Sequence, residues 1–301
     1  MDISLALGGG GAKGNAHIGV LRQLEKEGFH IRAIAGTSFG GIVAGMYASG
    51  YTPDEIEDNF ASVDQTRLYS YFSGSKPSLL GLGGVRKWLD DAIGGRTFQD
   101  LKLPCALTAV DLNHGREVVL HAGLLKDAIL ATIAVPGVFP AFPMHEKDLV
   151  DGGVLNPVPV SLARKLMPHL PVVAVTLQVP LGKPSQSGAV SMPSPVHVPG
   201  GLTKPIFERI SNLRVTQAFE IFMRSVDIGN RALSEYRLIV DKPDVIIKPD
   251  VADIPLLGLV DVREVAQRGD AAVLAVLPEL KASVRWTSRL RRSLFGGSLV
   301  S

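Results

Sequence analysis

Ser38 lies at the centre of the pentapeptide Gly36-Thr37-Ser38-Phe39-Gly40, which matches the pattern G-x-S-x-G. The pattern is typical of a nucleophile elbow, a sharp turn from a strand into a helix that exposes one serine hydroxyl. The turn forces an unfavourable backbone on the serine, so its neighbours two positions away must be small, as Gly36 and Gly40 are. The pentapeptide therefore predicts a serine nucleophile. The alternative is a glycine-rich turn whose serine only caps a helix.

A run of four glycines, Gly8 to Gly11, follows an apolar segment and precedes a helical pattern. The run fits the dinucleotide fingerprint G-x-G-x-x-G, but that reading needs an acidic residue after the second strand, where this chain has Ala35-Gly36. A Walker A loop is excluded, because Lys13 is preceded by alanine and followed by glycine. What remains is a loop of adjacent backbone N–H groups at the start of a helix, unobstructed by side chains, and this is the arrangement that an oxyanion hole needs. The alternative is a tight turn, which one or two glycines would satisfy.

Asp151 begins the sequence Asp151-Gly152-Gly153 directly after the short apolar segment Leu149-Val150. This placement leaves its carboxylate at the edge of the expected sheet, where it could act as a general base. An isolated Asp-Gly-Gly is more often only a turn. In combination with the serine and the glycine run, it supplies the base that the chemistry needs.

The elements around these motifs alternate between strand and helix. Ile3–Leu7, a helix to about Glu27 capped by Gly28, and Ile31–Ala35 form a βαβ unit. Later elements are expected as follows: a helix from the capping box at Thr52–Glu55, a helix over Val85–Ile93, a hairpin of Pro104–Asp111 and Glu117–His121, a helix over Leu124–Val135, a strand at Leu149-Val150, a helix from about Pro157, a strand over Val172–Val179, a helix over about Phe207–Ser234, a strand over Val245–Ile247 and a helix over Val262–Ala275.

This alternation predicts a three-layer α/β/α fold with an open, mostly parallel sheet and helices on both faces. We expect one domain over residues 1–301, with a flexible flap at 182–205 and a basic C-terminal helix or tail at 279–301. Ligands of such sheets bind where the strands end, so the three glycine-bearing turns could share one edge.

The composition excludes several classes of protein. With 31 Lys and Arg against 29 Asp and Glu, the net charge of +2 argues against a nucleic-acid binder. Cys105 is the only cysteine, so we expect no intrachain disulfide and no cysteine-based metal site. The start of the chain has no signal-peptide pattern, and glycines or prolines interrupt the uncharged runs 33–53 and 128–144. We therefore expect a soluble, cytoplasmic protein.

At this point the chain resembles the patatin-like phospholipases, lipid acyl hydrolases that use a Ser–Asp dyad. The resemblance covers about Ile3 to Val179. It rests on the three motifs in the family's order and on a further run before Asp151: Gly9-Gly10-Gly11-Ala12-Lys13-Gly14, Gly36-Thr37-Ser38-Phe39-Gly40, Asp151-Gly152-Gly153 and Ala131 to Pro140. Many members have arginine in place of Lys13. If this side chain binds lipid phosphate, lysine offers a single ammonium group, whereas arginine could donate two parallel hydrogen bonds to the phosphate.

The resemblance implies that Ser38 attacks an ester carbonyl, Asp151 takes its proton and the N–H groups of Gly9 to Gly11 hold the oxyanion. The substrate would be a phospholipid or another acyl ester, and neither a metal nor an organic cofactor is implied. The resemblance does not give the oligomeric state.

Three rival hypotheses remain at this level. A Ser-His-Asp hydrolase would place its histidine after Asp151, at His169 or His197. A non-catalytic regulatory or scaffold protein could keep the fold, and a nucleotide-binding protein could use the glycine loop. Separately, the basic amphipathic segment after 279 suits peripheral contact with a membrane, or equally a C-terminal helix packed on the sheet.

Overall fold

The computed structural model describes residues 1–63, 82–184 and 206–285. An eight-stranded sheet forms the centre of the fold. Its strands are β1 (Asp2–Leu7), β2 (His30–Thr37), β3 (Cys105–Asp111), β4 (Arg116–Leu120), β5 (Phe142–Met144), β6 (Lys147–Asp151), β7 (Val172–Val175) and β8 (Val245–Ile247). The α-helices are α1 (Ala16–Lys26), α2 (Phe39–Ala48), α3 (Pro53–Ser62), α5 (Gly83–Ile93), α6 (Leu125–Thr132), α7 (Val160–Leu166), α8 (Ile206–Asp241), α9 (Val262–Ala275) and α10 (Leu277–Ser283). Short 3₁₀ helices are η1 (Gly11–Asn15), η2 (Phe98–Asp100) and η3 (Gly152–Val154).

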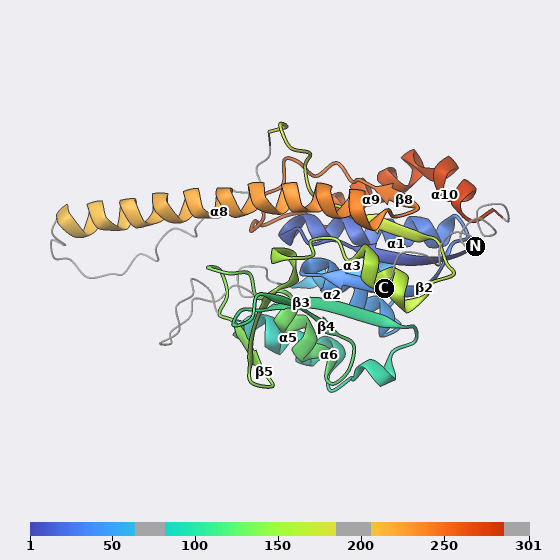
Figure 1. Cartoon of the computed structure of the whole chain (residues 1–301), viewed down its shortest axis with the longest axis horizontal. Helices are drawn as coiled ribbons and strands as arrows, with labels where there is room; N and C mark the ends of the chain where they lie inside the picture. Colours follow the sequence, from blue (N-terminus) through green and yellow to red (C-terminus); the bar gives the residue numbers. More distant parts are fainter. Residues whose placement is uncertain (64–81, 185–205, 286–301) are drawn as a thin grey trace.

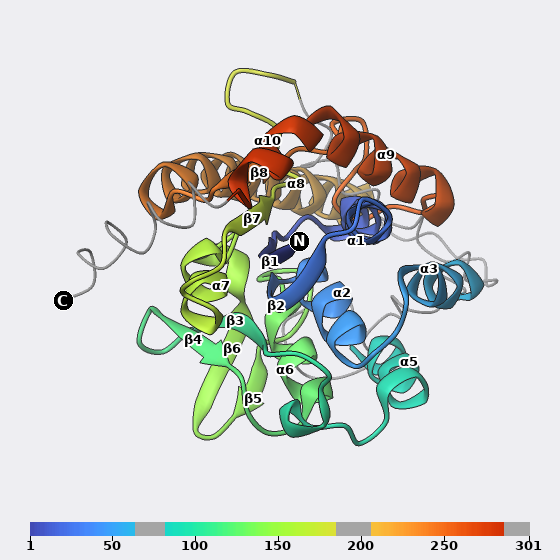
Figure 2. The same cartoon turned by 90° about the vertical axis from the view of Figure 1, so that its right-hand side faces the viewer.

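The strand order is β5-β6-β3-β2-β1-β7-β8, with β4 paired to β3. The strands β3, β2, β1, β7 and β8 run parallel, while β4, β5 and β6 add antiparallel pairs at one side. Helices cover both faces of this sheet: α7 lies on one face, and α2 and α6 lie on the other (Figure 2). The predicted α/β class and mostly parallel sheet are confirmed.

Two strands meet end to end along one edge of β3. Thr108 of β3 pairs with Thr37 of β2 and with Val119 of β4, while the next residue, Ala109, pairs with Asp151 of β6 and again with β4. Because a strand residue has one partner on each edge, β2 and β6 must occupy the same edge of β3. Since β2 runs parallel to β3 and β6 antiparallel to it, their carboxyl ends face each other. This arrangement brings the end of β6 to the serine turn.

The two faces of the sheet are packed differently. Large side chains such as Leu5 and Ile34 belong to the main core with α1, α2 and α6. On the other face, α7 packs on a row of fully buried alanines from four neighbouring strands: Ala6, Ala35, Ala106 and Ala174. Small side chains let a helix lie close to the sheet, whereas the large ones fill the wider space on the opposite face.

Helix α9 crosses α1 at close range. A Cβ atom on Gly19 of α1 would lie 1.8 Å from the carbonyl oxygen of Ala266, and one on Gly269 of α9 would lie 1.9 Å from that of Ala16. The long helix α8 contacts α7, and its first turns project beyond the rest of the described chain (Figure 1). Within the described residues, no helix is both long enough and apolar enough to span a membrane.

Several predicted boundaries differ from the structure. Strand β7 stops at Val175 instead of Val179, because its neighbours β1 and β8 end opposite that residue. Helix α8 continues to Asp241, and the short strand β5 was not predicted. Most of the predicted flap, residues 185–205, lies outside the described residues, as do residues 286–301 of the basic segment. In its described part, Leu280 is fully buried, so that part packs on the core.

Candidate active site

Ser38 occupies a strained turn between β2 and α2. Its φ of 54° and ψ of −127° lie in a region that side-chain-bearing residues rarely adopt. The flanking glycines are required: a Cβ on Gly36 would lie 2.5 Å from the carbonyl oxygen of Gly40, and one on Gly40 would lie 2.4 Å from that of Leu7. The predicted strand–turn–helix elbow is therefore present, and the strain is held by close backbone contacts on both sides.

Thr132, at the end of α6, fixes the backbone of this turn. Its hydroxyl accepts the N–H of Ser38 at 2.9 Å and donates to the carbonyl of Thr108 at 2.6 Å. The neighbouring hydroxyl of Thr37 donates to the carbonyl of Asn156 at 2.8 Å. All four of these threonine and serine residues are buried, so these hydrogen bonds operate without competition from water. Sequence reasoning missed Thr132, whose only signal was a polar residue at the end of an apolar helical run.

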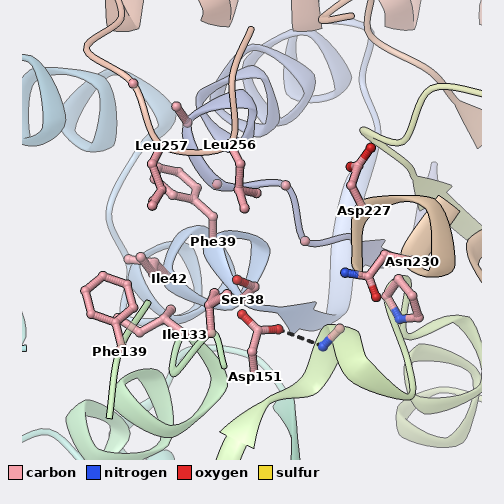
Figure 3. A pocket seen from close by; sticks show the side chains of 18 of the residues that line it. Ser38, Phe39, Ile42, Ile133, Phe139, Asp151, Asp227, Asn230, Leu256 and Leu257 are labelled. Carbon is pink, nitrogen blue, oxygen red and sulfur yellow. Dashed lines mark hydrogen bonds between the residues drawn. The ribbon is translucent and has the colours of Figure 1, made fainter. Parts of the chain in front are cut away.

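Asp151 ends β6 with its side chain facing that of Ser38 (Figure 3). Only 6% of the residue is exposed. Burial raises the pKa of its carboxyl from the ordinary 3.8 to about 6, while the hydrogen-bonding interaction with the Ser38 side chain and the N–H of Gly153 act in the opposite direction. The Gly153 N–H donates to Oδ1 at 2.7 Å. The carboxylate is thus a stronger base than a solvated aspartate, and it is still mostly ionised at neutral pH.

The glycine loop presents its donors unequally. The N–H of Gly9 donates to the carbonyl of Pro157 at 2.9 Å, and the N–H of Ala12 donates to the carbonyl of Leu256 at 2.9 Å. Gly10 and Gly11 lie between these two residues in the chain, and their N–H groups have no hydrogen-bond acceptor among the described residues. Both residues line the pocket that contains Ser38. The expected trio must therefore be corrected: the donor of Gly9 is already used, which leaves Gly10 and Gly11 for an oxyanion.

His17 supports this loop from beneath. It is fully buried, and its Nε2 lies 2.7 Å from the carbonyl oxygen of Gly8. Burial lowers its pKa to about 4, so the ring is neutral at neutral pH and can donate this hydrogen bond from Nε2. The peptide between Gly8 and Gly9 is consequently held at both ends, by His17 and by Pro157. Nothing in the local sequence pattern around His17 reveals this contact.

Lys13 does not face the pocket. Only 1% of the residue is exposed, and it is absent from the pocket lining. Burial lowers its pKa to about 8, while the carboxylates of Asp227 and Asp253 act to raise it. Lys13 is therefore a buried cation that interacts with the carboxylates of Asp227 on α8 and of the exposed Asp253, and this placement does not suit the binding of a lipid phosphate.

The pocket around Ser38 has two chemically different sides. We call the side formed by Phe39, Ile42, Phe60, Trp88, Ile133 and Phe139 the apolar arm, and the group Gln178, Asp227 and Asn230 the polar arm. In Figure 3, Ile42, Ile133 and Phe139 lie on one side of Ser38, and Asp227 and Asn230 lie on the other. Stacked aromatic rings line part of the apolar arm, with centroids 5.1 Å apart for Phe39 and Phe60 and 5.0 Å for Phe60 and Trp88. Such a pocket can hold a molecule with one apolar and one polar end.

No histidine of the described chain lines this pocket. His169 is exposed in the turn before β7, away from Ser38, and His197 lies outside the described residues. Among the described residues there is also no cluster of three or more histidine, cysteine or acidic side chains suited to a metal ion. The structure therefore brings together Ser38, Asp151 and the glycine loop, and it gives no support to His169 as a third member.

The fold and this site define an α/β protein with a serine elbow above a parallel sheet. Within that class, the chain belongs to the patatin-like phospholipase family, whose family model matches residues 5–164, just over half of the chain. The match includes the glycine loop, the elbow and Asp151. Helices α8, α9 and α10 lie beyond it.

Relatives and a solved structure agree with this assignment. An uncharacterized NTE family protein of Mycobacterium tuberculosis is 38% identical over 164 residues, which cover 53% of this chain and 44% of the relative. The uncharacterized protein YqhO of Bacillus subtilis is 34% identical over 209 residues, 59% of this chain and 72% of that protein. The crystal structure of VipD from Legionella pneumophila shares the fold, with a TM-score of 0.57 at 12% identity, over 92% of this chain and 66% of that one. The chain spans less than half the length of the mycobacterial relative.

Proposed function

We propose that this protein is a lipid acyl hydrolase that cleaves carboxylic esters through a Ser38–Asp151 dyad and an acyl-enzyme. The observation that carries the proposal is the meeting of a strained serine with a buried carboxylate of raised pKa at the wall of a largely apolar pocket. Membership of the patatin-like phospholipase family supports the same chemistry. The proposal treats residues 1–301 as one hydrolase domain, because α8 lines the pocket and α9 packs on α1.

In the first half of the reaction, Ser38 Oγ attacks the ester carbonyl while Asp151 takes the hydroxyl proton. The carbonyl oxygen becomes an oxyanion, which the N–H groups of Gly10 and Gly11 stabilise. The bond from the carbonyl carbon to the leaving oxygen then breaks, and the alcohol departs with the proton that Asp151 held. The acyl group stays on Ser38.

In the second half, water attacks the acyl-enzyme and gives one proton to Asp151. Collapse of the second tetrahedral intermediate releases the fatty acid, and Ser38 Oγ regains the proton from Asp151. A carboxylate with a pKa of about 6 suits both directions, because it accepts a proton readily and also returns it near neutral pH. The apolar arm would take the acyl chain, since burial of each methylene stabilises binding by about 0.8 kcal/mol.

The proposal is tested by assaying the purified protein on a p-nitrophenyl ester and a panel of glycerolipids, beside Ser38→Ala and Asp151→Asn. We expect fatty-acid release by the wild type only. Asp151→Asn should lose nearly as much activity as Ser38→Ala, because both remove part of one nucleophile-activating unit. A folded protein that releases no acid from any ester, or an active Ser38→Ala variant, would refute the proposal.

A further inference from the structure

The charges at the pocket wall restrict the kind of ester that fits it. Of the described residues that line the pocket, none is lysine, arginine or histidine, and the two that carry charge are Asp151 and Asp227. Asp151 lies beside Ser38, and Asp227 lies in the polar arm (Figure 3). An anionic group in this pocket would therefore meet carboxylates and no cation of the described lining.

Lys13 and Arg231 both interact with Asp227 of the polar arm, but neither lines the pocket. Lys13 is buried and interacts electrostatically with Asp227 and with the exposed Asp253. Arg231, which is 7% exposed, donates from Nε to the carbonyl of Val179 at 2.8 Å. Its Nη2 donates to the carbonyls of Pro180 and Lys183, both at 2.7 Å, and its Nη1 lies 3.7 Å from the Asp227 carboxylate. The guanidinium is thus occupied by backbone oxygens and one carboxylate, and it cannot donate a pair of hydrogen bonds to a phosphate.

Neutral hydrogen-bonding groups are available instead. Asn15 is 4% exposed and lines the pocket. Its Nδ2 donates to the carbonyl of Ala12 at 2.9 Å, which fixes the orientation of the amide, and its Oδ1 has no partner among the described residues. A buried acceptor without a donor is unfavourable and rare in folded proteins. This oxygen is shielded from solvent and therefore from a bound molecule. The side-chain amides of Gln178 and Asn230 line the pocket, and both can donate to and accept from hydroxyl groups.

We infer that the polar arm receives an uncharged, hydroxyl-bearing leaving group, so that the enzyme prefers neutral acyl esters of the glyceride class to esters with an anionic phosphate. This inference rests on the proposed acyl-hydrolase function and names its substrate class. The alcohol that leaves with the proton from Asp151 would be glycerol or an acylglycerol. A phosphate in the same place would lose its water without gaining a counter-charge, which disfavours binding and reaction.

The test compares three soluble octanoyl esters: 1-octanoylglycerol, 1-octanoylglycerol 3-phosphate and p-nitrophenyl octanoate, all assayed below micelle formation. We expect kcat/KM for the glycerol ester to exceed that for the phosphate ester by about tenfold or more. A ratio of one or below, with p-nitrophenyl octanoate hydrolysed, would overturn the inference and leave the proposed function standing. If p-nitrophenyl octanoate is not hydrolysed either, the proposed function itself fails, and the inference fails with it.

A charge placed in the polar arm gives a second readout. Asn230→Lys should raise the phosphate-to-glycerol ratio of kcat/KM by about tenfold, because it adds a cation to a pocket lining that has none among its described residues. Ser225→Lys is the matched control: it adds the same charge to α8, but Ser225 is exposed and does not line the pocket. We expect no change in its ratio. An equal rise in both variants, or none in a folded Asn230→Lys, would show that the polar arm does not select the leaving group.

Discussion

Replacing Asp151 by asparagine should change folding stability in a pH-dependent way that is separate from its effect on activity. Burial raises the pKa of this carboxyl from 3.8 to about 6. Since one pKa unit corresponds to about 1.4 kcal/mol, the ionised carboxylate destabilises the folded protein by about 3 kcal/mol above pH 6. Between pH 4 and 6 the folded state binds more protons than the unfolded state, so this group's contribution to stability falls as the pH rises. Below about pH 4 both states are protonated and the cost disappears.

The asparagine side chain is nearly isosteric and keeps an oxygen for the N–H of Gly153, but it does not ionise. The difference in unfolding free energy, Asp151→Asn minus wild type, should therefore grow by about 2.4 kcal/mol between pH 4, where the unfolded carboxyl is already partly ionised, and pH 8. Urea unfolding followed by circular dichroism at both pH values measures this change. Asp148→Asn, an exposed position on the same strand, is the control and should change little at either pH.

A difference that stays constant between pH 4 and pH 8 would refute this reasoning. It would mean that Asp151 titrates alike in the folded and unfolded states, so burial does not raise its pKa. The pH dependence of the wild-type kcat/KM should report the same ionisation. About nine tenths of Asp151 is ionised at pH 7 and about a tenth at pH 5, so kcat/KM should fall nearly tenfold from pH 7 to pH 5. A profile that is flat to pH 5 would contradict the pKa assignment from the side of catalysis.

Three further substitutions test the parts that hold the site. Gly10→Ala, whose Cβ would lie 2.8 Å from Leu177 Cδ1, should lower kcat on a p-nitrophenyl ester by about 10²–10³ with the fold kept; near-normal turnover would remove Gly10 from the oxyanion hole. His17→Ala should reduce kcat by at least about tenfold with little change in KM. His17→Gln should restore part of kcat, because its amide can donate to the carbonyl of Gly8. An equal loss of kcat in both variants would indicate that His17 acts by packing alone. Thr132→Val should lower the free energy of unfolding by about 1–3 kcal/mol, because the N–H of Ser38 loses its acceptor. Thr132→Ser keeps the hydroxyl and should recover this stability, as measured by urea unfolding. A valine variant as stable as the wild type would contradict the role of this hydroxyl.

The elbow could be predicted from sequence because its requirements are local. A serine with positive φ needs small neighbours at fixed positions before and after it. A side chain at Gly36 would meet Gly40 within the turn, and one at Gly40 would meet the end of β1 and the start of the glycine loop. Alternation of apolar segments likewise predicted the parallel strands and the βαβ opening. These features depend on spacing, which the sequence displays directly.

The position of Asp151 was predicted for a reason that proved incomplete. We expected three turns at one edge because parallel strands end there, yet β6 is antiparallel to β3. It reaches Ser38 from the opposite direction, end to end with β2. A short strand such as Leu149-Val150 shows its periodicity but not its direction, because direction is decided by pairing with distant residues.

The supports of the glycine loop could not be predicted at all. The use of the Gly9 donor depends on Pro157, and the orientation of the Gly8 carbonyl depends on His17 in a helix packed below the loop. The burial of Lys13 depends on Asp227 of α8, far along the chain. Such long-range contacts leave no local pattern, so the sequence could not show that the N–H of Gly9 is already bound by Pro157.

The most direct test of the central claim is covalent labelling with a fluorophosphonate, followed by peptide mapping of the modified residue. We expect one label on Ser38 in the wild type, none in Ser38→Ala, and a rate reduced by several orders of magnitude in Asp151→Asn. Replacement of His169 or His197 by alanine should leave the labelling rate within a few-fold. A label on another residue, an unlabelled wild type, or a folded histidine variant as unreactive as Ser38→Ala would contradict a Ser38–Asp151 dyad.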